Sequence, residues 1–429
     1  MPLDTALVDA LRATAGAARR VGGANGLAWR RFLRERWGWA PRVGAARGPR
    51  IWLVCAPGGE VVQTAPLVPA LRRALPDATL VLSTTNEAFL AVASRMPGLD
   101  ACLFTPFDRP APVRRALATL RPDLVVTVES AFAPVLVREA RRFGATTMLA
   151  SGTMTADYDR DPAWARPLRH RVFDHVDVVG VKAGDEPAAF ARFGVPASRV
   201  RVLGDLRYDP SFYRVDDAER TALRARLAST ADERLFVAGS LRDGEEPIVL
   251  DAYRALRDKH ADLRLVLAPR FTAQAAGVER AAAARGLTVT RVSTGAAPGA
   301  DVVLLDTYGD LARVYALASV VFLGGTLVHV GAGLGQNLVE PLAHGAPVFF
   351  GPHVRRWTAI TRELTEIYPG LAVSGAADLA RGVLDLEGAP AVVAALRERA
   401  GAIMARGADA TARHVEAIRD VLAARVRAA

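Results

Sequence analysis

The sequence predicts an α/β protein with two Rossmann-like domains that face each other across a cleft. Three observations lead to this fold class. The chain has 429 residues, more than a single hydrophobic core usually serves. Short apolar runs alternate with segments of helical periodicity, which is typical of a mostly parallel sheet with helices on both faces. The alternation stops once, at residues 207–220, and then begins again.

The first series of elements predicts one parallel sheet, in a domain that spans 48–212. The expected strands are 50–56, 79–84, 101–107, 123–129 and 146–151, followed by the runs "VDVVGVKA" and "VRVLGD". The helices expected between them are 62–75, 87–96, 111–120 and 134–144. The interruption at 207–220 contains a proline, four acidic residues and no strong periodicity, so we place the domain boundary there.

The second series predicts a second domain over 213–429, with the last helices as candidates to return to the first domain. Its expected strands are 234–240, 263–270, 319–325 and the runs "LTVTRVS", "DVVLLDT" and "APVFFG". Its expected helices are 245–258, 273–286, 309–317 and 336–344. Ligands of open parallel sheets bind at the carboxyl ends of the strands, so residues that end strands are the candidates for a functional site.

Much of the net charge of +10 comes from the N-terminus. Residues 1–50 hold ten arginines against three acidic residues, with Leu, Phe and Trp side chains among them. No run there approaches the roughly 18 apolar residues of a spanning helix, and no signal-peptide pattern is present. We therefore expect 1–47 to be a basic amphipathic segment, which either binds an anionic membrane surface or packs as a helix on its own domain.

Neither nucleic acid as a partner nor a disulfide or zinc site is expected. The rest of the chain has neither a basic stripe nor a known reader motif, so nucleic acid is not predicted as a partner. Cys55 and Cys102 lie in apolar runs, which indicates reduced core thiols and a cytoplasmic location, without a disulfide framework or zinc spacing.

Two carboxylates end predicted strands in the first half. Glu60 follows Gly58 and Gly59 after the first strand, and "DLVVTVE" ends on Glu129. Each acid alone is also explained by a helix start, where it interacts favourably with the helix dipole. Together they fit general base catalysis, in which a shielded carboxylate accepts a proton from a substrate hydroxyl. Gly58 and Gly59 remove bulk where that substrate needs access, and Ser151 ends another strand; we predict that these three bind the acceptor.

A glycine-rich stretch, "FLGGTLVHVGAGLGQNLVEPLAHG", dominates the second half. A loop of this kind before a helix presents backbone N–H groups to an anion such as phosphate, although its spacing is neither the Walker nor the dinucleotide fingerprint. Asn337 and Glu340, one helical turn apart, can bind hydroxyls of a ribose or sugar. Arg270 ends a strand and either binds an anion through its fork of donors or is simply exposed. The predicted donor-binding residues are Ser240, Arg270, Gly324, Gly325, Gly335, Gln336, Asn337 and Glu340.

A set of motifs in a fixed order carries a family resemblance along nearly the whole chain. They are "PGGE" (57–60), "PFDRP" (106–110), "VESAFAP" (128–134), "GVPASRVRVLGDLRYD" (194–209), "AGSLRDGEE" (238–246), "LVLAPR" (265–270) and "NLVEPLAHGAPVFFGPH" (337–353). In this combination they resemble the Kdo transferases (3-deoxy-D-manno-octulosonic acid transferases) of lipopolysaccharide assembly, which have the GT-B glycosyltransferase fold.

The chain also departs from the family pattern. Pro57 stands where the family has Ser, and Ala131-Phe132-Ala133 stands where it has Glu-Leu-Trp. Leu241 corresponds to the His after Ser-Thr, and Phe271 to the His after Pro-Arg. The family's Asn-Ala-Arg-Leu-Ser is Ser-Gly-Thr-Met-Thr from Ser151, and its Gly-Gly-His-Asn loop is expanded to "GAGLGQN". These changes fall on both the acceptor and donor sides, so a paralogue that transfers another sugar is an open alternative.

The resemblance implies an inverting transfer of Kdo from CMP-Kdo to a lipid A precursor, by a peripheral protein at the cytoplasmic face of the inner membrane. Glu60 would be the base, and Glu129 would orient the acceptor or support Glu60. The glycine-rich loop and Arg270 would hold the anionic donor. Neither a metal nor another cofactor is expected, because the leaving group is already an acidic phosphate. The alternatives are a GT-B transferase or epimerase that uses a UDP-sugar, and a non-catalytic paralogue.

Overall fold

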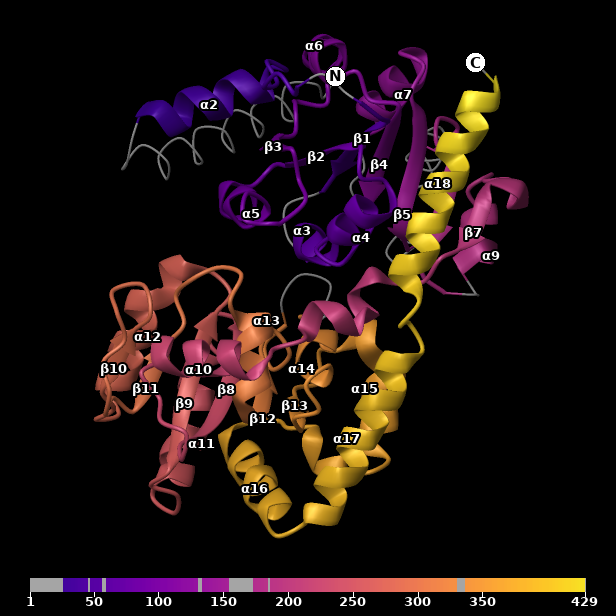
Figure 1. Cartoon of the computed structure of the whole chain (residues 1–429). Coiled ribbons are helices and arrows are strands. Elements are labelled where there is room, and N and C mark those ends of the chain that lie inside the picture. Colours follow the sequence, from indigo (N-terminus) through magenta and orange to yellow (C-terminus); the bar gives the residue numbers. More distant parts are fainter. Residues whose placement is uncertain are drawn as a thin grey trace, which may run out of the picture. The chain divides into compact units, whose positions relative to one another are not determined.

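The chain divides into two compact units, each with its own parallel sheet (Figure 1). The computed structural model describes residues 26–44, 47–55, 59–129, 133–153, 173–183, 186–329 and 336–428. Unit 1 comprises residues 1–206 and 409–429, and unit 2 comprises residues 207–408. The predicted α/β class with two sheets is confirmed.

The first boundary of unit 2 differs from the expected one, and at the other end the last helix returns to unit 1, which the sequence had left open. The first boundary lies at 206 rather than 212, because Tyr213 is buried in the unit 2 core and Tyr208 and Phe212 pack against it. The second lies at 408, because Ile418 and Leu422 of the last helix are buried in a unit 1 core. Neither segment has a periodic pattern that tells which core its apolar side chains join.

The described part of unit 1 contains a seven-stranded parallel sheet in the order β3-β2-β1-β4-β5-β6-β7. Its strands are β1 (Arg50–Val54), β2 (Thr79–Thr84), β3 (Ala101–Phe104), β4 (Leu124–Val128), β5 (Thr146–Gly152), β6 (Val178–Val181) and β7 (Val200–Val202). The order runs one way from β1 to β3 and the other way from β4 to β7. The topological switch point therefore lies between β1 and β4, where doubly wound folds bind ligands.

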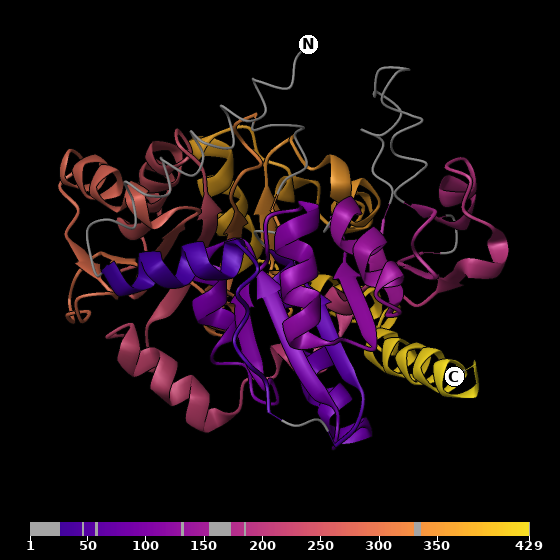
Figure 2. The same ribbon diagram turned by 90° about the horizontal axis from the view of Figure 1, so that it is seen from above.

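Helices cover both faces of this sheet because side chains alternate along the strands. Ile51 and Leu53 belong to one core, and Trp52 and Val54 to the other. Figure 2 shows α6 and α7 together over the sheet, while α18 packs against α4 and β5 (Figure 1). The described helices are α2 (Gly26–Arg36), α3 (Gly59–Gln63), α4 (Leu67–Ala74), α5 (Glu87–Ala93), α6 (Pro110–Leu120), α7 (Pro134–Arg142), α9 (Glu186–Ala191) and α18 (Ala410–Ala428).

Unit 2 has, among its described residues, a six-stranded parallel sheet in the order β10-β11-β9-β8-β12-β13. Its strands are β8 (Arg234–Leu241), β9 (Leu263–Pro269), β10 (Val289–Arg291), β11 (Val302–Leu304), β12 (Ala318–Leu323) and β13 (Val348–Phe350). Its helices are α10 (Asp217–Arg226), α11 (Glu246–Arg257), α12 (Ala275–Ala283), α13 (Leu311–Val314), α14 (Val339–Leu342), α15 (Thr358–Thr365), α16 (Ala376–Glu387) and α17 (Pro390–Ala405). Here the switch point lies between β8 and β12.

Most expected helices are shorter than predicted, and for two of them a residue near the start of the helix explains the difference. The helix expected at 62–75 is divided into α3 and α4, and Pro66 directly precedes the second piece. Proline has no N–H to continue a ladder from α3 but is compatible with a helix start. The helix expected at 336–344 covers only Val339–Leu342. It begins at Val339 because the Asn337 side chain accepts the Val339 N–H in a local turn before the helix.

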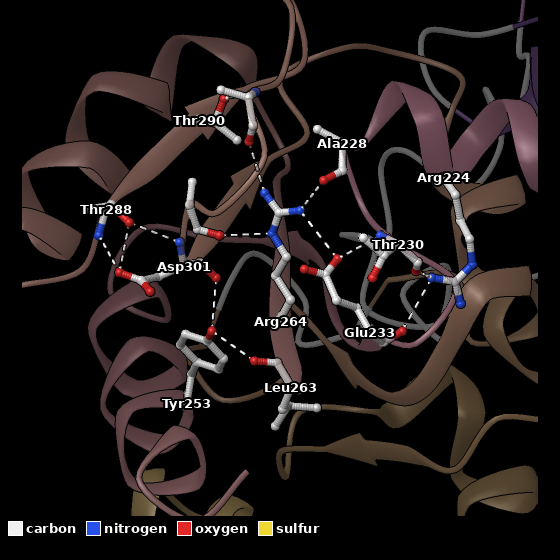
Figure 3. A network of polar contacts seen from close by, with 12 residues as sticks. Arg224, Ala228, Thr230, Glu233, Tyr253, Leu263, Arg264, Thr288, Thr290 and Asp301 are labelled. Carbon is white, nitrogen blue, oxygen red and sulfur yellow. Dashed lines mark hydrogen bonds and ion pairs between the residues drawn. The ribbon is translucent and has the colours of Figure 1, made fainter. Parts of the chain in front are cut away.

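The amino ends of the unit 2 strands are joined by a buried network around Arg264 (Figure 3). Arg264 is 4% exposed and donates to the carbonyls of Ala300, at 2.8 Å, and Ala297, at 3.1 Å. The Tyr253 hydroxyl donates to Asp301 O at 2.9 Å. These groups satisfy one another, so this end of the sheet is structural, and the opposite, carboxyl end is the candidate for binding.

Within the described residues, the structure contains no helix with the length and apolar character required to cross a membrane.

Candidate active site

Both predicted carboxylates lie at the switch point of the unit 1 sheet. Glu60 is in the first turn of α3, soon after β1, and Glu129 directly follows β4, the neighbouring strand. Each residue is 7% exposed. Glu129 has a φ of 52°, a left-handed conformation that a residue other than glycine rarely adopts, and its N–H donates to Ala150 O. Gly59 has no atom near the place of a Cβ, whereas Gly58 and Pro57 lie outside the described residues.

Lys182 connects two acidic side chains at this edge of the sheet. It follows β6, and its Nζ lies 2.5 Å from Glu129 Oε1 and 3.6 Å from Asp205 Oδ2. Lys182 was not among the residues predicted from the sequence, although it directly follows a strand as Glu129 does. Asp205 also accepts a hydrogen bond from Gln63 Nε2 at 3.0 Å. Because Gln63 is one turn of α3 from Glu60, this network links both predicted catalytic elements.

Ser151 lies near the end of β5, as expected, and its side chain is hydrogen-bonded within unit 1. It is fully buried, and its φ is 49°. Its hydroxyl donates to Gly204 O at 3.4 Å and accepts the Leu206 N–H at 3.2 Å. The geometry therefore gives this side chain a role in holding the segment around Asp205, and direct binding of the acceptor stays a prediction.

In unit 2, a buried glutamate organises the loop after β12. Glu245 is 0% exposed, and its carboxylate accepts the N–H groups of Gly325, Thr326 and Leu327 at 2.6, 2.9 and 2.8 Å. The Gly324 N–H donates to Gly239 O. We expected the glycine-rich loop to present such groups to a phosphate, but these four are already bound within the protein. The N–H is the only donor that a glycine has, so a phosphate contact of Gly324 or Gly325 requires one of these hydrogen bonds to be shared or broken, and it remains a prediction.

Both glycines have a packing reason for their identity. A Cβ on Gly324 would lie 2.6 Å from the Leu241 backbone, and Gly325 has a φ of 67° beside the Gln336 side chain. Gly335 lies outside the described residues.

Two arginines approach each other at the carboxyl ends of β8 and β9. Arg242 and Arg270 lie 5.1 and 5.8 Å from the ring centroid of Phe271, which is 48% exposed. Burial, and then the positive charge of Arg270, lower the pKa of Arg242. Arg242 Nε is buried and has no hydrogen-bond partner among the described residues. Two like charges with an unused donor are a favourable arrangement for binding an anion.

Arg242 was also not among the residues predicted from the sequence. In the family resemblance, Leu241 stands at the position of the family's basic His. Leu241 is fully buried in β8. The basic side chain of this stretch is the next residue. Ser240, between Gly239 and Leu241, is partly buried with a φ of 59° and so has the conformational strain expected near a functional site.

Asn337 and Glu340 form a pair rather than two separate donors and acceptors. Asn337 Nδ2 donates to Glu340 Oε1 at 3.0 Å. Burial raises the pKa of Glu340, opposed by the Asn337 hydrogen bond and by the charges of Arg270 and Arg207. The charges of Arg270 and Arg207 thus reach Glu340, and binding of the donor by Asn337 and Glu340 stays a prediction. Gln336 accepts the Trp357 Nε1–H through its backbone carbonyl at 2.6 Å.

The helix α2 packs on unit 1, which is one of the two interpretations of the N-terminal segment. Phe32 contacts Phe104 of β3 with ring centroids 4.9 Å apart, and Glu35 Oε2 accepts the Phe104 N–H at 2.7 Å. Trp37 and Trp39 after the helix remain 49% and 57% exposed. The packing accounts for one face of residues 26–44 and leaves Trp37 and Trp39 exposed, whereas residues 1–25 and 45–46 of the predicted segment lie outside the described residues.

No group of three or more potential metal ligands occurs in the part of the chain that the structure describes. Cys55 is buried and Cys102 partly buried, and both are free thiols.

Solved structures with the same two-sheet fold define the fold class of this protein. The Neisseria meningitidis UDP-GlcNAc 2-epimerase aligns with 86% of this chain and all of its own length, with a TM-score of 0.61 and 12% identity. Anabaena HepE in complex with UDP-glucose aligns with 88% of this chain and all of its own, with a TM-score of 0.58 and 15% identity. The protein therefore has the two-domain GT-B fold, as predicted.

Sequence relatives identify the family within that class. Residues 31–210 match the model of the 3-deoxy-D-manno-octulosonic-acid transferase (kdotransferase) family. The 3-deoxy-D-manno-octulosonic acid transferase of Bordetella pertussis is 30% identical over 418 residues, 94% of either chain. The Haemophilus influenzae enzyme of the same name is 25% identical over 353 residues, 82% of either chain. The chain belongs to the 3-deoxy-D-manno-octulosonic acid transferase family of glycosyltransferases, which confirms the predicted family.

Proposed function

We propose that this protein is an inverting glycosyltransferase that moves Kdo from CMP-Kdo to a lipid A precursor in lipopolysaccharide biosynthesis. The observation that carries the proposal is the pair of shielded carboxylates, Glu60 and Glu129, at the switch point of the unit 1 sheet in a chain of this family. An alternative use of a UDP-sugar has less support, because its structural neighbours are only 12% and 15% identical and indicate the fold alone.

On the acceptor side, Glu60 is the proposed general base. It accepts the proton of the attacking hydroxyl, and the oxygen displaces the nucleotide at the anomeric carbon in one step with inversion. Glu129, paired with Lys182 at 2.5 Å, positions the acceptor and keeps the edge of the sheet ordered. Gly59 leaves open space next to the base. The acceptor contacts of Gly58 and Ser151 belong to the same proposal.

On the donor side, Arg270 and Arg242 neutralise the anionic groups of the nucleotide sugar. Asn337 and Glu340, which are already hydrogen-bonded to each other, bind its hydroxyls. The remaining predicted contacts are Ser240, Gly324, Gly325, Gly335 and Gln336. The leaving group is an acidic phosphate monoester, so the departure of the nucleotide requires neither a general acid nor a metal cofactor.

The protein acts as a peripheral enzyme at the cytoplasmic face of the inner membrane. Exposed Trp37 and Trp39 beside the arginine-rich α2 are suited to the interface of an anionic bilayer. The lipid acceptor lies in that bilayer, so this surface brings the enzyme and its substrate together.

The test is incubation of the full chain with CMP-Kdo and a lipid A precursor, followed by mass spectrometry of the lipid. A gain in mass of one or more Kdo residues supports the proposal, and Glu60→Gln abolishes most of it. Unchanged lipid, together with thermal stabilisation by a UDP-sugar and not by CMP, would overturn the proposal in favour of the alternative chemistry.

A further inference from the structure

His414 connects the last helix of the chain to the acceptor side of unit 1. It lies in the second turn of α18 and is 0% exposed. Its Nε2 is 3.1 Å from the Ser151 backbone nitrogen, and its Nδ1 is 2.8 Å from Ala410 O. A backbone N–H can only donate, so Nε2 is unprotonated and Nδ1 carries the hydrogen that Ala410 O accepts. The contacts therefore select one neutral tautomer.

Ser151 in turn contacts the residues that flank Asp205. The Ser151 hydroxyl binds Gly204 O and the Leu206 N–H, the residues on either side of Asp205. Asp205 in turn contacts Gln63 on α3, at 3.0 Å, and Lys182, at 3.6 Å. Thus three contacts within unit 1 lead from His414 to Gln63, on the helix of Glu60, and to Lys182, which pairs with Glu129.

Two neighbouring features support a fixed arrangement at this place. The Arg413 Nε donates to Leu203 O at 3.0 Å, so consecutive residues of α18 hold the same segment. Gly204 has a φ of 90°, and a Cβ there would lie 3.0 Å from Ala410. The helix and the segment 203–206 are therefore in close contact over several residues.

We propose that His414 is a positioning residue for glycosyl transfer: its neutral imidazole accepts the Ser151 N–H and thereby holds Asp205 where it aligns Gln63 and Lys182. This inference rests on the proposed function for its kinetic consequence, but not for its structural one. The charged groups that act on the imidazole are Asp205, from the segment after β7, and Arg413, from its own helix.

Two substitutions in the full chain separate positioning from simple packing. In His414→Gln, the amide oxygen can take the place of Nε2 and accept the Ser151 N–H. In His414→Asn, the shorter amide reaches only as far as Nδ1 and leaves that N–H without its partner. We expect the kcat for Kdo transfer to fall about tenfold in the Asn variant and to stay within about threefold in the Gln variant, with the KM for CMP-Kdo unchanged in both.

A readout without Kdo transfer distinguishes failure of this inference from failure of the proposed function. The rate at which a small amine-acylating reagent modifies Lys182, followed by mass spectrometry, should rise at least about threefold in the Asn variant and not in the Gln variant. Equal labelling rates in the wild type and the Asn variant would overturn the inference, even if the wild type transfers Kdo. An inactive wild type with the expected labelling would overturn only the function.

The wild-type protein provides a measurement that does not depend on whether a variant folds. Nitrogen-15 NMR of the imidazole distinguishes the two neutral tautomers. An unprotonated Nε2 at pH 7 supports the proposal, and a protonated Nε2 contradicts it.

Discussion

Lys182 Nζ lies 2.5 Å from Glu129 Oε1, and both side chains are about one-tenth exposed, at 10% and 9%. The same ammonium is 3.6 Å from Asp205, so one cation stands between two carboxylates at the carboxyl edge of the unit 1 sheet. These three side chains come from the ends of three different strands.

Removal of that cation should destabilise unit 1. In Lys182→Met, the two carboxylates face each other without the positive charge, and breaking a buried pair in this way costs roughly 3 kcal/mol of unfolding free energy. Urea unfolding measures the loss. The double variant Lys182→Met with Glu129→Gln should recover part of it, since one of the two negative charges is then gone. A single variant as stable as the wild type would contradict the role given to Lys182.

Glu60→Gln should impair the chemical step and leave binding nearly intact. The amide keeps the shape of the side chain but cannot accept the proton, so kcat should fall by about 10² to 10⁴ with little change in either KM. Glu87→Gln is the matched control, because Glu87 is also a first-turn acid after a strand of the same sheet, but it is exposed. Equal kcat values for the two variants would show that Glu60 is not the base and acts only as an acid at a helix start.

Arg242 and Arg270 should both contribute to binding of the nucleotide. Isothermal titration with CMP should give a Kd about tenfold higher for Arg242→Gln and for Arg270→Gln, because each loses a charge-assisted contact to the phosphate. Arg280→Gln, on the exposed face of α12, should bind as the wild type does. A normal Kd for Arg242→Gln would remove it from the donor site.

His414 should make unfolding depend on pH in a defined window. Burial lowers the pKa of His414 from 6.5 to about 4. Between these values the unfolded chain binds a proton that the folded protein does not, so the stability falls as the pH falls from about 6.5 to about 4, by roughly 3 kcal/mol. Above pH 6.5 the group contributes no pH dependence.

The His414→Gln variant isolates this effect from that of the other titrating groups. The difference in unfolding free energy between wild type and variant should change across that window and remain constant from pH 7 to 8. Parallel curves over the whole range would show that His414 titrates normally.

Trp37 and Trp39 should contribute to membrane binding. Replacement of both by Ser should reduce co-sedimentation with vesicles that contain anionic lipid, since it removes the apolar part of the proposed interface. Phe143→Ser, at another exposed aromatic residue of unit 1, is the control and should sediment as the wild type does. Loss of binding in the control alone would place the membrane surface elsewhere.

Much of the fold could be predicted because its signals are local. Apolar runs and helical periodicity predicted strands such as β1, β2 and β4 to within two residues of their observed ends. Polar residues at those ends drew attention to Glu60 and Glu129, since parallel strands bring their carboxyl ends to one edge. The order of motifs then indicated the family.

Other features depend on contacts between residues far apart in the chain. Packing decides three of them. Glu245 accepts hydrogen bonds from the backbone N–H groups after β12, and Lys182 pairs with Glu129. Leu241 is buried, so the basic side chain at this place is that of Arg242. The return of α18 to unit 1 brings His414 to Ser151, 263 positions away in sequence. Sequence periodicity determines which face of an element is buried, but only the tertiary structure decides which distant side chain it meets there, because that depends on how the elements pack together.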